Sequence, residues 1–146
     1  MTENDYVIEV HPGVAALGAA EWDALLSTQA QPTPFMRHAY LLALETSASV
    51  GGDTGWEPAT LTVRERDGGA LVAAASAWLK SHSYGEYVFD WAWADAYRRY
   101  GVPYYPKLLV AVPFTPVPGS RLLARDAPAR ALLLRALGAL AREMDC

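Results

Sequence analysis

Two carboxylates in an aromatic stretch are the first candidates for acid–base chemistry in this chain. Glu86 and Asp90 lie four residues apart between Ser81 and Gly101, a spacing that places both on one side of a helix. At about 100° per residue, Asp90 also falls on the side that carries Trp93. An inward carboxylate must be paired, hydrogen-bonded or protonated, because leaving it bare costs several kcal/mol. Asp90 is therefore either a site carboxylate or the partner of a tyrosine hydroxyl, an indole N–H or loop amides.

Glu86 also has a structural interpretation. Ser83 and Glu86 match the capping box, in which the serine oxygen accepts from the Glu86 amide and the carboxylate bonds back to the Ser83 amide. This motif predicts a helix over Glu86–Tyr100. Within that helix, one stripe is expected to face the core: Phe89, Trp93, Tyr97 and Tyr100. The opposite face is expected to lie in water: Asp95, Arg98 and Arg99.

The remaining candidates are residues that could contact a ligand. His82 precedes the predicted helix and either transfers a proton or lies hydrogen-bonded at the surface. Trp91 lies nearly opposite the aromatic stripe, where the surface that buries the stripe cannot also bury it. Four more candidates surround a strand and a proline-rich turn: Tyr104, Tyr105, Lys107 and Arg121. Such a set either binds an acidic or peptide-like ligand or packs a strand edge with the lysine in water.

Several classes of enzyme are excluded by motifs that the sequence lacks. It contains no G-x-S-x-G elbow, P-loop, G-x-G-x-x-G or H-E-x-x-H. His11 and His38 have no companion acid or cysteine at ligand spacing, and Cys146 is the single cysteine. Neither a metal site nor a disulfide framework is therefore expected.

Composition and charge describe one globular domain. The 146 residues are 52% hydrophobic and 19% charged, which is enough to bury a core. No run approaches the ~18 apolar residues of a membrane span, and the N-terminus lacks the features of a signal peptide. We therefore expect a cytoplasmic protein without a membrane span.

Charge is unevenly distributed within the net value of −4. Residues 1–96 carry 13 acids and 4 bases, whereas residues 97–146 carry 3 acids and 8 bases. The basic third is either an anion- or RNA-binding face or a solvated helix face, and it has no lysine- and arginine-rich run. No DNA partner is expected.

A sheet and several helices must position these candidates. The expected elements are strand 5–10, helix 14–27, a helix capped by Thr33, hairpin arms 56–66 and 70–80, helix 86–100, strand 104–114 extended by 120–124, and a last helix capped by Asp126. The second hairpin arm is apolar on both faces and should lie inside the sheet. This order indicates an α/β or α+β fold with helices against a single sheet.

The run KSHSYGEYVFDWAWADAYRRYGVPYYPKLLVAVPFTPVPGSRLL closely resembles the signature of a widespread bacterial family. That family is grouped with the FemAB-like peptidoglycan biosynthesis proteins and the GNAT acyltransferase superfamily. The earlier run PTPFMRHAYLLALETSASVGGDTGWEPATL resembles the N-terminal region of the same family. The resemblance implies a GNAT-like acyl-CoA N-acyltransferase fold with a mostly antiparallel central sheet flanked by helices.

The resemblance also implies a longer protein. Family members are much longer and look like two GNAT-like halves, so residues 1–146 correspond to a single N-terminal domain that is incomplete relative to the family. Strand edges and a helix face that a second half would cover are then expected to be exposed, or shielded by a second copy in a homodimer. A fragment of this kind is expected to be inactive alone.

The donor that the resemblance implies is acyl-CoA or aminoacyl-tRNA. GNAT proteins hold the CoA pyrophosphate in a Q/R-x-x-G-x-G/A loop at a helix N-terminus. The corresponding segment here, GSRLLARDAPAR, lacks those glycines and places Asp126 at the helix start. Fem-type transferases instead take an aminoacyl group from tRNA, which suits the missing loop and the basic C-terminal third.

Two functions are consistent with the residues and the resemblance. The first is the N-terminal part of a FemAB-like N-acyl or aminoacyl transferase acting on an amine acceptor such as a peptidoglycan precursor, with Asp90, and then Glu86, near the acceptor amine. Its expected ligand contacts are Tyr84, Tyr105, Lys107 and Arg121. The second is a non-catalytic binding or scaffold module of the same fold that recognises a cell-wall peptide or a protein partner.

Overall fold

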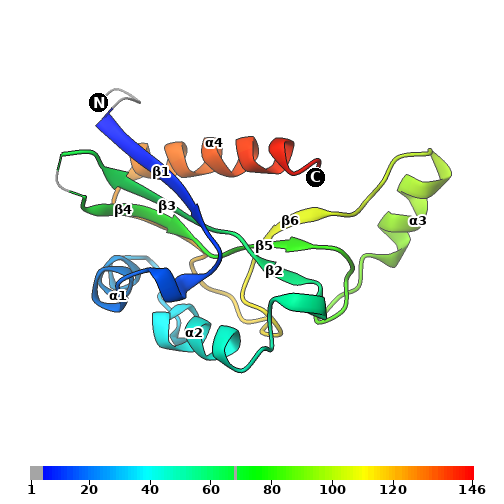
Figure 1. Ribbon diagram of the computed structural model, residues 1–146, viewed down its shortest axis with the longest axis horizontal. Helices are drawn as coiled ribbons and strands as arrows, with labels where there is room; N and C mark the ends of the chain where they lie inside the picture. The colour runs from blue at the N-terminus through cyan, green and yellow to red at the C-terminus, as the bar shows by residue number, and fades with distance from the viewer. Residues whose placement is uncertain (1–4, 68) are drawn as a thin grey trace.

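The computed structural model describes residues 5–67 and 69–146 and shows a mixed α+β protein (Figure 1). Its strands are β1 (Tyr6–His11), β2 (Trp56–Pro58), β3 (Thr60–Glu65), β4 (Leu71–Ala75), β5 (Ala77–Lys80), β6 (Lys107–Val110) and β7 (Leu122–Ala124). Its α-helices are α1 (Ala19–Ser27), α2 (His38–Thr46), α3 (Trp91–Arg99) and α4 (Ala127–Glu143). The predicted mixed fold class is confirmed, and the strand pairings of the described residues are antiparallel.

The strands form two sheets rather than the predicted single sheet. One sheet has the order β1-β3-β4-β7, and the other has the order β2-β5-β6. Both arms of the predicted hairpin pass from one sheet into the other, at Ala59 and at Ser76. Pro58 ends β2, and the Ala59 amide between the two sheets donates to the Ala77 carbonyl at 2.8 Å. The second arm lies between two neighbours in each sheet, as predicted.

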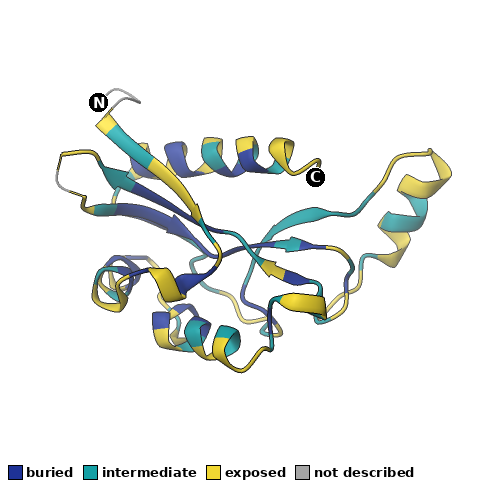
Figure 2. Ribbon diagram, in the orientation of Figure 1, coloured by how far each residue is buried: buried dark blue, intermediate teal, exposed yellow. Residues whose placement is uncertain are grey.

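Helices cover both faces of the four-stranded sheet. In Figure 1, α4 lies along one face, and α1 and α2 lie on the opposite side. Successive alanines of β4 alternate between the two layers: Ala74 joins the core that contains Trp22, whereas Ala73 and Ala75 join the core that contains Leu133 of α4. Figure 2 shows the resulting band of buried residues along these strands and the inner side of α4.

The helix predicted over residues 14–27 is interrupted. Its first part is a 3-10 turn, and α1 starts only at Ala19. The amides of Val14 and Ala15 donate to the Glu45 carboxylate at 2.6 and 3.2 Å. A carboxylate from α2 thus satisfies the amides that a continuous helix would have left at its N-terminus.

The next helix also starts later than predicted. Thr33 precedes a 3-10 turn over Pro34–Met36 without capping it through its side chain, and Arg37 is extended before α2 begins at His38. The His38 amide donates to the Asp23 carboxylate at 2.9 Å. This contact between helices takes the place of the predicted local cap.

The aromatic segment departs most from its prediction. The helix predicted over Glu86–Tyr100 is reduced to α3, and residues 83–90 form a loop. The stripe predicted to face the core is exposed by 42% to 86%: Phe89, Trp93, Tyr97 and Tyr100. In Figure 1, α3 stands at one end of the molecule, away from the other helices. We call residues 84–102 the aromatic arm.

The C-terminal elements match their predictions in part. β6 covers only Lys107–Val110, and β7 is not its extension but pairs with β4 in the other sheet. α4 begins as predicted, with Asp126 Oδ1 accepting from the Ala129 amide at 2.8 Å. Among the described residues, none of the helices has the length and apolar character that a bilayer crossing requires.

Candidate functional site

Two lysines face each other across the antiparallel pair of β5 and β6. Lys80 ends β5 and is the register partner of Lys107, which begins β6. Like charges at opposed positions of a sheet repel each other. Glu86 lies between them, with Oε2 2.8 Å from the Lys107 Nζ and Oε1 4.0 Å from the Lys80 Nζ. This carboxylate is therefore the counter-ion that lets the two strands pair here.

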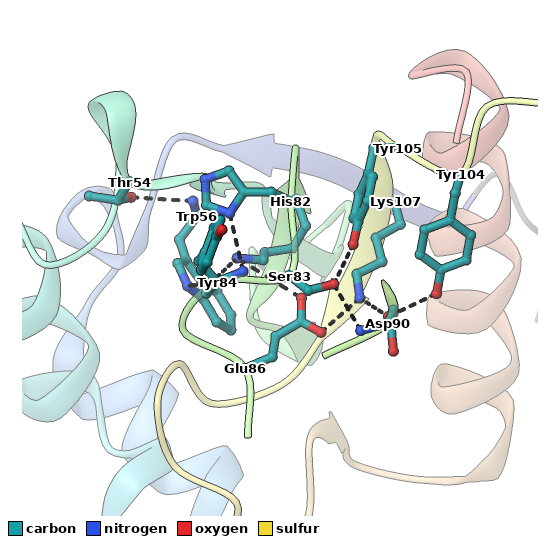
Figure 3. Close-up of polar contacts among 11 residues, drawn as sticks. Thr54, Trp56, His82, Ser83, Tyr84, Glu86, Asp90, Tyr104, Tyr105 and Lys107 are labelled. Atoms are coloured by element: carbon teal, nitrogen blue, oxygen red, sulfur yellow. Dashed lines mark hydrogen bonds and ion pairs between the residues drawn. The ribbon is translucent and has the colours of Figure 1, made fainter. Parts of the chain in front are cut away.

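Asp90 extends the cluster on the other side of Lys107. The Lys107 Nζ donates to Asp90 Oδ2, and the Tyr104 hydroxyl donates to the same oxygen at 2.8 Å. A tyrosine hydroxyl is one of the partners that the sequence predicted for an inward carboxylate at this position. Figure 3 shows Lys107 between the two carboxylates, with Tyr104 beyond Asp90. Two ammonium and two carboxylate groups thus balance one another within the cluster.

Ser83 holds the loop that carries both carboxylates, but not through the predicted capping box. Its Oγ accepts from the Asp90 amide at 3.1 Å and shares a hydrogen bond with the Tyr105 hydroxyl. The Glu86 carboxylate pairs with the lysines instead of returning to the Ser83 amide. The capping-box prediction is wrong because a charge-assisted bond to an ammonium is stronger than one to a backbone amide. Ser83 thereby places Asp90 beside Lys107.

A carbonyl and an indole ring hold the Lys80 ammonium. The Tyr84 carbonyl accepts from the Lys80 Nζ at 2.9 Å and from the Trp56 indole at 3.2 Å. The ammonium also lies 3.9 Å from the Trp56 ring centroid, in a cation–π contact. Gly85 follows with a φ of 82°, and a Cβ there would come within 2.5 Å of both Trp56 and Phe114. Glycine therefore allows the turn that brings the Tyr84 carbonyl onto the lysine.

Burial and pairing shift the pKa values of these groups. Burial lowers the pKa of Lys80 to about 8, against the opposing charge of Glu86. Burial also acts to lower the pKa of Lys107, but the hydrogen bonds that Lys107 donates to Asp90 and Glu86 outweigh burial, so the pKa of Lys107 is raised. Burial acts to raise the pKa of Asp90, yet the bonds from Lys107 and Tyr104 keep that pKa below its ordinary value. Burial and the bond to Asp90 raise the pKa of Tyr104 to about 12.

A cleft of about 210 Å³ opens beside Glu86. It is lined by Trp56, Gly85, Glu86, Tyr87, Val88, Leu109, Ala111, Val112, Phe114, Thr115 and Pro116. Glu86 is the one charged residue in this set. Its Oε1 is buried and receives no hydrogen bond from the described residues. The Lys80 Nζ, 4.0 Å from this oxygen, is an ion-pair partner beyond hydrogen-bond distance. A mostly apolar cleft bordered by such a carboxylate suits a ligand that brings a hydrogen-bond donor, such as an amine.

The structure brings most of the predicted site residues together. Six of them form or border the cluster: Tyr84, Glu86, Asp90, Tyr104, Tyr105 and Lys107. His82 lies next to them, and its Nδ1 accepts from the Tyr84 amide at 3.2 Å. The predicted site thus corresponds to one connected region at the ends of β5 and β6.

Two predicted residues lie outside this cluster. Trp91 belongs to the aromatic arm, where it stacks on Phe89 with ring centroids 4.8 Å apart. Arg121 lies in the proline-rich segment before β7, and its guanidinium donates to the Val117 carbonyl. Neither residue shares a hydrogen bond with the carboxylates among the described residues. Their predicted ligand contacts stay predictions.

Lys80, Trp56 and Ser83 are site residues that sequence reasoning missed. Lys80 ends an otherwise apolar strand, and a charge buried at such a position needs a partner. That feature was the available signal for its pairing with Glu86. Ser83 was recognised only as a helix cap, and Trp56 carries no comparable signal, because their contacts depend on how the strands and the loop come together.

The start of α4 does not fit the pyrophosphate of an acyl-CoA donor. The Asp126 carboxylate accepts from the Ala129 amide at 2.8 Å and from the Arg125 guanidinium at 3.3 Å. A negative charge thus stands where a phosphate would need free helix amides. Within residues 5–67 and 69–146, no group of three or more His, Cys, Asp or Glu side chains is arranged to hold a metal ion.

The fold and the site together define an α+β domain with a lysine–carboxylate cluster beside an apolar cleft. A family model, FemAB-like, described as peptidoglycan biosynthesis/recognition, matches residues 13–146. The chain therefore belongs to the FemAB-like family, which relates its function to peptidoglycan. No curated protein and no solved structure matches the chain, so the GNAT-like topology stays a prediction.

Proposed function

We propose that this domain binds the amine acceptor of an N-acyl or aminoacyl transfer reaction, with a peptidoglycan precursor as the acceptor. The supporting observation is the asymmetry of Glu86. Its Oε2 accepts from the Lys107 Nζ at 2.8 Å, whereas its buried Oε1 lies 4.0 Å from the Lys80 Nζ and receives no hydrogen bond from the described residues. Because Glu86 also lines the cleft, an acceptor amine bound there can supply the missing donor.

In this proposal Glu86 accepts the proton of the acceptor amine. The amine nitrogen attacks the carbonyl carbon of the donor ester and loses a proton in the process. A C–N bond forms, the C–O bond to the donor breaks, and the departing oxygen takes up a proton. Lys80 and Lys107 fix the position of the Glu86 carboxylate between them.

Asp90 has a positioning role in this proposal. Its Oδ2 already accepts from Lys107 and Tyr104, and its lowered pKa makes it a weak base. By holding the Lys107 ammonium, it helps to hold Glu86 at the cleft. In this proposal Glu86, rather than Asp90, is the main carboxylate near the acceptor amine. The sequence analysis favoured the reverse order.

Aminoacyl-tRNA is the donor that fits this proposal. The carboxylate of Asp126 occupies the helix start at which a CoA pyrophosphate would bind. Residues 97–146, with 8 bases and 3 acids, can contribute attraction for a polyanionic donor. Acetyl-CoA is the alternative donor, and it serves as the comparison in the assay.

Transfer assays on the full-length protein test the role of Glu86. The acceptor is a soluble peptidoglycan precursor peptide with a free amine, and aminoacyl-tRNA and acetyl-CoA are offered separately. We expect Glu86→Gln to lower kcat by about 100-fold or more and Asp90→Asn to lower it less. The control is Asp95→Asn, a carboxylate of the arm, which should leave transfer unchanged. Equal kcat values for Glu86→Gln and the native protein would refute the proton-acceptor role.

The native protein and its Glu86→Gln variant also distinguish a transferase from a non-catalytic binding module. Its supporting observation is that the cluster balances its own charges, as a structural site does. Calorimetry with the precursor peptide measures binding without turnover. Binding that Glu86→Gln weakens, with no product from either donor, would favour the binding module over the transferase.

A further inference from the structure

A second cleft lies between α1 and the segment that leads into α2, at the opposite end of the molecule from α3 (Figure 1). Its volume is about 440 Å³, against about 210 Å³ for the cleft beside Glu86, and the two clefts share no lining residue. The polar part of its wall consists of Asp23 and Ser27 from α1 and of Thr33 and Arg37 from the segment. A cleft of this size can hold a small ligand, and the proposed transfer reaction does not use it.

Hydrogen-bond donors without acceptors gather at this cleft. Thr33 Oγ1 and Arg121 Nη1 are buried, and neither has a hydrogen-bond partner among the described residues. The two side chains are neighbours, because a Cβ at Gly119 would lie 2.3 Å from Thr33 Cγ2 and 3.0 Å from Arg121 Nη1. The Arg37 guanidinium, on the cleft wall, forms no hydrogen bond or ion pair within residues 5–67 and 69–146. Since unpaired donors are costly in a folded protein, a ligand that brings an acceptor fits here.

The charges around the cleft indicate which acceptor fits. Asp23 is the one acid on the wall, and its Oδ1 already accepts from the His38 amide at 2.9 Å. The guanidinium groups of Arg37 and Arg121 contribute two positive charges and Asp23 one negative charge, which leaves a net charge of +1. A monoanionic carboxylate, which a guanidinium can bind through two parallel hydrogen bonds, therefore fits better than a phosphate dianion. The second oxygen of Asp23, Oδ2, can accept from an N–H group next to that carboxylate.

We propose that this second cleft binds the C-terminal carboxylate of a peptide. The Arg37 guanidinium and the Thr33 hydroxyl donate to the carboxylate, and Asp23 Oδ2 accepts from the last amide N–H of the peptide. Arg121 lies behind Thr33 and off the cleft wall, so its charge attracts the carboxylate without contacting it. The binding function is independent of the proposed transfer at Glu86, because the two clefts have separate walls.

Calorimetric titration of the full-length protein with acetyl-alanyl-alanine, and with the C-terminal amide of the same peptide, tests the role of the carboxylate. We expect the acid to bind about ten-fold or more tightly than the amide, and Arg37→Gln to abolish this preference. Thr33→Val should weaken binding of the acid by about five-fold. The control is Arg130→Gln, at an exposed arginine of α4, which should bind like the native protein. Absence of binding, equal affinity for acid and amide, or an Arg37→Gln variant that keeps the preference would overturn the proposal.

Two further probes test whether the ligand is a peptide terminus. In acetyl-alanyl-lactate an ester oxygen replaces the last amide N–H, so this probe should bind about ten-fold more weakly than acetyl-alanyl-alanine because Asp23 loses its donor. Inorganic phosphate should displace acetyl-alanyl-alanine only weakly. Equal binding of the ester and the amide-linked peptide, or phosphate that binds more tightly than either, would overturn the proposal. Circular dichroism verifies that each variant is folded, and no acyl donor is present, so these results do not depend on whether Glu86 supports transfer.

Discussion

Helices α3 and α4 carry comparable amphipathic patterns but lie in opposite environments. α4 buries four leucines against the sheet: Leu132, Leu133, Leu137 and Leu140. α3 has larger apolar side chains and yet contains no buried residue. The difference lies in the surface that each apolar stripe meets. The stripe of α4 packs on one face of the sheet, against β3, β4 and β7, while α1 and α2 cover the other face of that sheet. Periodicity therefore identifies the apolar side of a helix but not the surface that it meets.

The charges of the two regions differ in the same way. On the arm, Arg98 and Arg99 pair with Asp95 while their side chains remain 80% and 76% exposed. In the site, Glu86 pairs with Lys107 and lies near the fully buried Lys80. Exposed pairs contribute about 0–1 kcal/mol, whereas removing one member of a buried pair leaves the other unpaired at a much higher cost. Stability measurements should therefore separate the arm from the rest of the molecule.

Replacing one large apolar side chain by alanine in α4 and in α3 should give the largest difference in the free energy of unfolding. Leu133→Ala, at a fully buried position, should lower the free energy of unfolding by about 2–5 kcal/mol because it leaves a cavity. Trp93→Ala should change it by less than about 0.5 kcal/mol. Urea denaturation followed by circular dichroism measures both. A loss in Trp93→Ala as large as that in Leu133→Ala would mean that the arm packs onto the body of its own chain.

The buried ammonium of Lys80 should make stability depend on pH. Its pKa is about 8 in the folded protein and 10.5 ordinarily, so between these values the unfolded chain binds more protons than the folded one. The free energy of unfolding should therefore rise with pH in this window, by about 2 kcal/mol between roughly pH 7 and 9.5. Lys80→Met removes this titration and should lack the rise.

Urea denaturation at steps across that pH range measures the two curves. Arg98→Met serves as the matched control from the arm, because an arginine does not titrate in this window and its side chain is exposed. It should follow the native curve. Parallel curves for the native chain and Lys80→Met would contradict a lowered pKa at Lys80.

Removal of one hydroxyl from the site should have a smaller effect. Tyr104→Phe deletes the bond to Asp90 Oδ2 and should lower the free energy of unfolding by about 1 kcal/mol. Tyr97→Phe is the matched change on the arm, and it should have almost no effect because Tyr97 contacts Tyr104 through its ring. Denaturation at neutral pH compares them. Equal losses would show that the hydrogen bond to Asp90 adds nothing to stability.

Features that depend on residues close in the sequence could be predicted. The strand at β1 needed only its composition and following turn, and α4 needed Asp126 and its repeated leucines. The hairpin between β3 and β4 was marked by its glycines and alternation, although the passage of each arm into a second sheet, at Ala59 and at Ser76, was not recognised. These elements form because their determinants are local.

Features that depend on distant partners could not be predicted in full. Glu86 follows Ser83 at the spacing of a cap, but its partner Lys107 arrives 21 residues later, when β6 pairs with β5. The sequence did single out residues that contact one another, since Tyr104 and Lys107 bond to Asp90 and Tyr105 bonds to Ser83. The pairing among them is set by strand register, which the sequence does not state. The aromatic stripe was misplaced for the same reason.

The smallest effect should come from the ion pairs of the arm. Asp95→Ala removes the shared partner of Arg98 and Arg99 and thus both ion pairs. These pairs are exposed and alanine favours a helix, so the free energy of unfolding should change by less than about 0.5 kcal/mol. Denaturation at low and high salt measures any difference. α3 has nine residues, fewer than the ~12–15 that an isolated helix needs in water. A salt-sensitive loss of more than about 1 kcal/mol would mean that these charges hold the helix together.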